Sequence, residues 1–130
     1  MKGDDSDLVL SKVLAFVWIV SIATVSYLSL KPKIEFPLDF EKADLVYHLI
    51  AYLWLSILPF FIFRREKTAY VFALLMLPLG AALELAQIAV PGRVSSPMDI
   101  GANSVGVILG LLCAKLLAYR LSRRSRETAR

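Results

Sequence analysis

Three sets of polar side chains recur at helical spacing within long apolar stretches of this 130-residue sequence. The first set, Asp44, His48 and Tyr52, is spaced by four residues, which places all three on one face of a helix. The second set is Glu84 and Gln87, again on one helical face. Because histidine titrates near neutrality, His48 with a carboxylate could carry protons or supply acid–base chemistry.

The third set follows a segment that contains Arg93. Asp99 and Asn103 are four residues apart, and Gly106 and Gly110 continue their stripe along the same helical face. Burying polar groups among apolar side chains is costly unless the groups pair with one another. We therefore expect one polar cluster or binding site made of these side chains: Asp44, His48, Tyr52, Glu84, Gln87, Arg93, Asp99 and Asn103.

Charge and chemistry suggest a role for each member of this cluster. Glu84 and Asp99 are the expected buried anions, and Arg93 would form a bidentate ion pair with one of them. His48 would be a proton carrier or a hydrogen-bond partner. Alternatively, the same groups neutralise one another and only fix the helix register. The amide and phenol side chains would complete the hydrogen bonding: Tyr52, Gln87 and Asn103.

Evidence for catalysis or for a cofactor is weak in this sequence. The run Ser96-Pro97-Met98-Asp99 resembles a helix cap, with proline at the first helical position, rather than a nucleophile motif. A metal site from His48, Glu84 and Asp99 is conceivable, but one histidine with two carboxylates is little support. We therefore assign no catalytic residue and expect neither a metal nor a cofactor.

Four apolar segments must position these residues. The chain is 58% hydrophobic, which is too much for the core of a small soluble domain and too much for a disordered chain. Each segment is about as long as a bilayer-spanning helix, and none shows the alternation of a barrel strand. We predict one all-α domain over residues 1–130, a bundle of four transmembrane helices at about 9–30, 45–63, 69–90 and 100–119.

Lysine and arginine predict the orientation of the bundle. They are enriched before the first span, between the second and third spans, and in residues 120–130, whereas the other two connections hold fewer. By the positive-inside rule both termini are cytoplasmic, and residues 120–130 form a basic tail that contacts anionic lipid heads. A nucleic-acid partner is disfavoured, because the tail lacks interleaved aromatic side chains beyond Tyr119.

This topology brings the polar sets to a similar depth. At about 1.5 Å per residue, His48 and Asn103 lie ~6 Å, and Glu84 ~10 Å, from the outer ends of their helices. Three helices therefore carry polar groups to one side of the membrane. We predict a polar pocket in the outer leaflet, roofed by residues 91–99. The cations near its mouth would be Lys33, Lys42 and Arg93.

Glycine and proline predict how the spans pack and bend. Gly106 and Gly110 form a GxxxG pattern that lets helices approach closely. We favour packing inside the monomer over homodimerisation, because the same face carries the third polar set. Pro78, with Gly80 near it, predicts a kink in the third span below Glu84.

The order and spacing of these residues resemble the VanZ-like family of small bacterial integral membrane proteins. The likeness spans residues 25–112. The family usually has a lysine directly after its first aspartate, whereas Leu45 stands there in this chain and Lys42 lies nearby. The matching residues are Ser29-Leu30-Lys31-Pro32 at the end of the first span, then Asp44, His48, Tyr52, Glu84, Gln87, Pro91, Arg93, Ser96, Asp99, Asn103, Gly106 and Gly110.

The resemblance implies a multi-pass protein of the bacterial cytoplasmic membrane, within the cell envelope. The name-giving member is associated with low-level resistance to the glycopeptide antibiotic teicoplanin. A basic outward pocket suits a lipid-linked envelope precursor, because arginine binds phosphate well. We therefore predict a non-enzymatic envelope protein, embedded in the lipid bilayer, with an outward-facing pocket for a lipid-linked or glycopeptide-related ligand.

Two other functions fit the same residues. A small membrane enzyme acting on a lipid-linked substrate would be recognised by turnover of a phospholipid or precursor by the purified protein. An accessory subunit of a larger membrane complex would copurify with a stoichiometric partner. No sequence feature identifies such a protein partner.

Overall fold

The computed structural model describes residues 2–32, 43–93 and 96–128, and these residues form helices and short connections without a strand. The all-α prediction is therefore confirmed for the described part of the chain. The helices, in chain order, are α1 (Lys2–Leu30), α2 (Ala43–Ile57), α3 (Pro59–Ile62), α4 (Glu66–Leu74), α5 (Met76–Gln87) and α6 (Pro97–Thr128).

Four stretches of the described residues are long and apolar enough to cross a membrane. They are Asp5–Leu30, Ala43–Ile62, Glu66–Gln87 and Pro97–Arg120, so α2 with α3 and α4 with α5 each make one span. These bounds agree with the predicted spans to within a few residues. The basic segment expected as a tail continues α6 as helix through Thr128.

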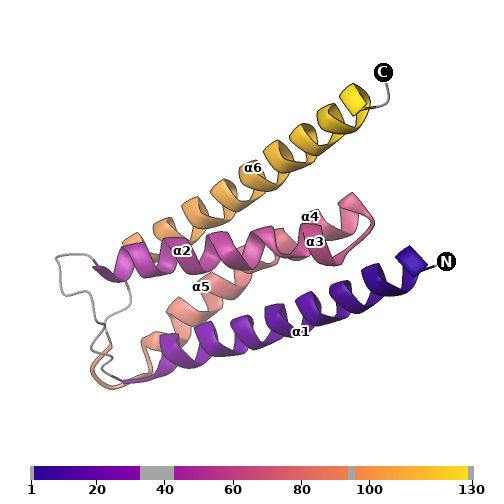
Figure 1. Ribbon diagram of the computed structural model, residues 1–130. Helices are drawn as coiled ribbons and strands as arrows, with labels where there is room; N and C mark the ends of the chain where they lie inside the picture. Colours follow the sequence, from indigo (N-terminus) through magenta and orange to yellow (C-terminus); the bar gives the residue numbers. More distant parts are fainter. Residues whose placement is uncertain (1, 33–42, 94–95, 129–130) are drawn as a thin grey trace.

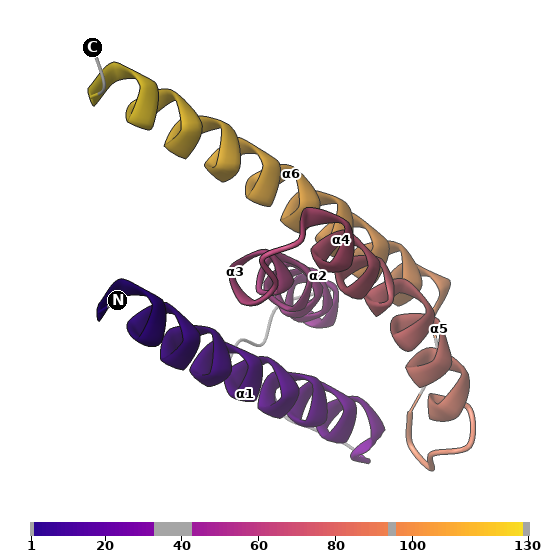
Figure 2. The ribbon, with the colours of Figure 1, turned by 90° about the vertical axis from the view of Figure 1, so that its right-hand side faces the viewer.

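Helix α2 lies in the middle of the bundle (Figures 1 and 2). Helix α6 packs along one side of it, α1 lies on the other side, and α4 and α5 complete the group. Much of the outer surface is apolar, including Phe16 at 69% and Ile19 at 61% exposure. Such a surface suits contact with lipid chains, which are as apolar as leucine. In Figure 1, α1 begins and α6 ends at the same end of the bundle.

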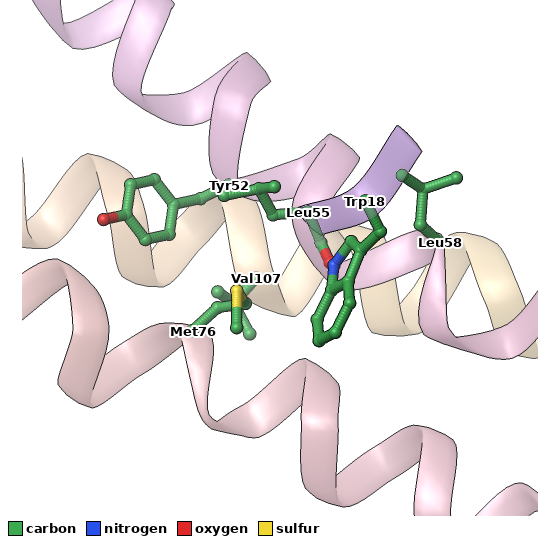
Figure 3. Close-up of a cluster of buried hydrophobic side chains, with 6 residues drawn as sticks. All are labelled: Trp18, Tyr52, Leu55, Leu58, Met76 and Val107. Atoms are coloured by element: carbon green, nitrogen blue, oxygen red, sulfur yellow. The ribbon is translucent and has the colours of Figure 1, made fainter. Parts of the chain in front are cut away.

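The second span breaks at Leu58, one residue before Pro59. Proline has no N–H, so the carbonyl of Leu55, four residues earlier, loses its helical donor. Trp18 Nε1 of α1 donates a hydrogen bond to this Leu55 oxygen at 2.8 Å. The indole therefore satisfies the freed carbonyl, as neighbouring helices do at prolines in membrane spans. Figure 3 shows Trp18 in a cluster of buried side chains with Tyr52, Leu55, Leu58, Met76 and Val107.

The third span divides at Leu75, between α4 and α5. Pro78 lies three residues later and cannot donate to the carbonyl of Leu74, where α4 ends. The break therefore lies farther from Glu84 than the kink that we expected near Gly80. Helix α5 then continues unbroken past Glu84 to Gln87.

The GxxxG pattern of α6 packs against α2 within the chain. A Cβ added at Gly106 would lie 3.0 Å from the backbone nitrogen of Leu53, and one added at Gly110 would lie 2.8 Å from the Leu53 oxygen. Because both neighbours are backbone atoms of α2, only glycine permits this close approach. Both glycines thus lie against α2 of the same chain.

We predict that Gly106→Ala lowers the melting temperature of the purified protein in detergent. The added methyl group must separate α2 from α6, at a cost of about 1–3 kcal/mol. Gly101→Ala in the same helix is the matched control, because no atom lies within 4 Å of its added Cβ. Equal melting temperatures for the two variants would contradict the packing of α6 on α2.

We predict that Trp18→Phe destabilises the protein by about 1–3 kcal/mol, because the buried Leu55 oxygen loses its donor. The phenyl ring keeps an aromatic group beside Phe72, which Trp18 now contacts edge-on. Trp54→Phe is the control, because its indole donates to the exposed hydroxyl of Ser21.

A second substitution tests the cause of the Trp18→Phe effect. Pro59→Ala restores an N–H to the second span, so Trp18→Phe should cost less in that background. An unchanged cost in denaturant or thermal unfolding would show that the indole does not replace a helical donor.

Candidate functional site

A polar cluster joins α2, α5 and α6 at the end of the bundle opposite to the start of α1. His48 of α2 lies with Nδ1 2.9 Å from Asn103 Oδ1 of α6 and 4.0 Å from Glu84 Oε1 of α5. His48, Glu84 and Asp99 each offer an atom of a type that binds metal ions, and the three atoms lie within 4.8 Å of one another. Residues far apart in the sequence thus meet in one small volume.

Most of this cluster is shielded from the surface. The exposed fraction is 1% for Glu84, 5% for Asp99 and 3% for Asn103. The His48 side chain is 15% exposed, so it is the member that reaches a neighbouring pocket. Because burying ionised groups is expensive, these contacts must offset a large desolvation cost.

Gly80 supports the cluster from α5, one helical turn before Glu84. A Cβ at Gly80 would meet Asn103 Nδ2 at 3.0 Å and Tyr52 Cε1 at 3.0 Å. Tyr52, which is 1% exposed, and Asn103 therefore press directly on the α5 backbone. Gly80 was expected only to bend the third span, although its spacing from Glu84 places both residues on one helical face.

Gln87 and Arg93 hold the end of α1 through hydrogen bonds to its backbone oxygens. Gln87 Nε2 donates to the Ser29 oxygen at 3.0 Å. Arg93 donates from Nη2 to the Leu28 oxygen at 2.7 Å and from Nε to the Lys31 oxygen at 3.1 Å. We call this group of three hydrogen bonds the α1 cap.

These hydrogen bonds of Arg93 go to backbone oxygens at the end of α1, and its expected bidentate pair with Glu84 or Asp99 stays a prediction. The last carbonyls of α1 attract these donors because they have no helical partners and carry partial negative charge. A guanidinium satisfies several such oxygens at once. Gly92, at φ 80°, makes the turn that directs the chain into Arg93.

Beside the cluster is a pocket of about 160 Å³ between α1, α2 and the segment after α5. Asp44 is exposed at its edge, and His48 connects it to the buried carboxylates. Tyr47 and Ser29 were not among the expected site residues; Tyr47 lies three residues after Asp44, on nearly the same helical face. The lining residues are Val25, Leu28, Ser29, Asp44, Tyr47, His48, Ala51 and Arg93.

Parts of the expected roof and mouth fall outside the described residues. The structure does not describe Lys33, Lys42 or residues 94–95, so their positions at the mouth and roof of the pocket stay predictions. The start of α6 is described and has the expected cap. Ser96 Oγ accepts a hydrogen bond from the backbone N–H of Met98 at 3.2 Å, with Pro97 as the first helical residue.

Comparison with known proteins gives one match. A family model described as VanZ/LLP1 matches residues 6–118, which is most of the chain. No curated protein matches, and no solved structure matches. The chain therefore belongs to the VanZ/LLP1 family, and its four apolar spans make it a multi-pass membrane protein.

Proposed function

We propose that this protein is a non-enzymatic cell-envelope protein whose pocket binds the phosphate-bearing head of a lipid-linked envelope precursor. The observation that carries the proposal is the lining of the pocket beside the buried cluster. Arg93, His48 and Asp44 meet there with apolar side chains of α1 and α2. Such a mixture suits an amphipathic ligand, with its head on the polar side and its chain on the apolar side.

Arg93 supplies the phosphate-binding chemistry of this proposal. Two of its N–H groups donate to the Leu28 and Lys31 oxygens in the α1 cap, and these bonds fix the guanidinium at the pocket. These two hydrogen bonds use two of the five guanidinium N–H groups, and arginine binds phosphate oxygens with matched geometry. An arginine already held in place loses less conformational entropy when a ligand binds.

The size of the pocket favours a head group over a whole antibiotic. Its volume of about 160 Å³ is below the ~300–1,000 Å³ typical of sites that enclose drug-sized molecules. A glycopeptide would extend far beyond such a space, whereas a phosphate group would not. Any effect on teicoplanin sensitivity would therefore act through the precursor, and we propose such an effect for this member of the family.

We propose that the pocket faces outward from the bacterial cytoplasmic membrane. The excess of lysine and arginine lies at the end of the bundle where α1 begins and α6 ends. Positive charge near span ends favours the cytoplasmic side. The pocket, at the other end, would then meet lipid-linked intermediates of the outer leaflet.

Binding to the purified protein in lipid nanodiscs tests the proposed ligand. We expect polyprenyl diphosphate to bind, and Arg93→Gln to weaken its Kd about tenfold to a hundredfold through loss of charged hydrogen bonds. Ala51→Phe should also weaken binding, because Ala51 lines the pocket without carrying charge. Arg65→Gln, exposed at the other end of the bundle, is the control.

Three results would contradict or replace the proposal. Equal Kd values for the wild type, Arg93→Gln and Ala51→Phe, with all three folded, would exclude this pocket as the site. Release of inorganic phosphate from the bound diphosphate would identify the small membrane enzyme instead. A stoichiometric protein copurifying without lipid affinity would favour the accessory-subunit alternative.

Cysteine labelling in intact cells tests the orientation. In a Cys113→Ser background, Lys31→Cys should react with a membrane-impermeant maleimide, because Lys31 is exposed beside the pocket. Lys67→Cys, exposed at the opposite end, should react only after the membrane is opened. The reverse pattern would place the pocket on the cytoplasmic side.

A further inference from the structure

We propose that His48, Glu84 and Asp99 bind a divalent metal ion of the Zn²⁺ or Mn²⁺ class. The three ligand-type atoms lie within 4.8 Å of one another and come from three different helices. This proposal does not depend on the lipid ligand proposed above, because it needs only the atoms of His48, Glu84 and Asp99 and no bound lipid.

The spacing of the donors is close to that of a metal site. At metal–ligand distances of about 2.1 Å, donor atoms around a tetrahedral ion lie roughly 3.4 Å apart. His48 Nδ1 and Glu84 Oε1 are 4.0 Å apart, and the cluster as a whole is within 4.8 Å. Side-chain rotations that bring the donors together by about 1 Å would complete such a site.

Asp99 provides an independent observation that points to a ligand. Its side chain is 5% exposed, and its Oδ1 atom is buried without a hydrogen bond from any residue that the structure describes. A buried acceptor left unsatisfied costs about 1–3 kcal/mol. Because the same carboxyl group supplies an oxygen to the group within 4.8 Å, an ion held there would give this buried acid a partner.

Charge favours a cation at the same place. Two carboxylates face a single imidazole, so the cluster is negative overall when both are ionised. The nearby guanidinium of Arg93 donates to the backbone oxygens of Leu28 and Lys31 at the end of α1. A divalent ion would neutralise the carboxylates and strengthen the contact between α2, α5 and α6.

The donor set indicates which ions fit. Imidazole suits zinc, iron, copper and nickel, whereas carboxylates also suit manganese. One imidazole with two carboxylates therefore suits a divalent ion such as Zn²⁺ or Mn²⁺, which would bind an unprotonated ring nitrogen. Because Asn103 Oδ1 lies 2.9 Å from His48 Nδ1, an ion bound at Nδ1 would take the place of this contact.

Metal analysis of the full-length protein tests the inference. After treatment with EDTA, the protein in detergent would be loaded with ZnCl₂ or MnCl₂, desalted and measured by mass spectrometry of the elements. We expect about one ion per chain and a rise of several degrees in melting temperature. Asp99→Asn should lose both effects while keeping the size of the side chain.

Matched variants make the outcome decisive. Glu66→Gln removes an exposed carboxylate from α4 and should bind metal like the wild type. His48→Gln should lose the metal, and it provides a second test if Asp99→Asn fails to fold. The inference would be overturned if the wild type held far less than one metal ion per chain. It would also be overturned if a folded Asp99→Asn variant held as many ions per chain as the wild type. Because no lipid ligand is added, neither result affects the test of the proposed function.

Discussion

The contact between His48 and Asn103 is the interaction on which the rest of the structure depends. It joins α2 to α6 at 2.9 Å, in the same small volume as two buried carboxylates. In an apolar setting, such groups are stable only when they meet one another with good geometry. Their meeting therefore fixes which faces of α2, α5 and α6 turn inward, and the register at which they pack.

Small residues make this meeting possible. Gly106 and Gly110 bring the backbones of α2 and α6 together, and Gly80 lets Tyr52 and Asn103 rest on α5. Helix α1 adds polar contacts with backbone oxygens to its apolar packing. Trp18 donates to the carbonyl that Pro59 frees, and the α1 cap holds the other end. The pocket lies along this last boundary, where α1 meets α2.

Much of the fold could be predicted from the sequence because hydropathy alone decides which segments cross a membrane. The polar residues of three helices could be grouped because helical spacing fixes the face on which each residue lies. The role of Arg93 could not be read in this way. Its partners are backbone oxygens at the end of α1, and a charge pattern contains no sign of them. Gly80 and Tyr47 were not predicted as site residues, because their places in the site depend on neighbours from other helices.

A double-mutant cycle on His48 and Asn103 tests the central claim most directly. Unfolding free energies would be measured for His48→Ala, Asn103→Ala and the double variant in the same detergent. We predict a coupling energy of about 1 kcal/mol or more, because the two side chains stabilise the protein through each other. Additive effects of the two substitutions would contradict a cluster shared between α2 and α6.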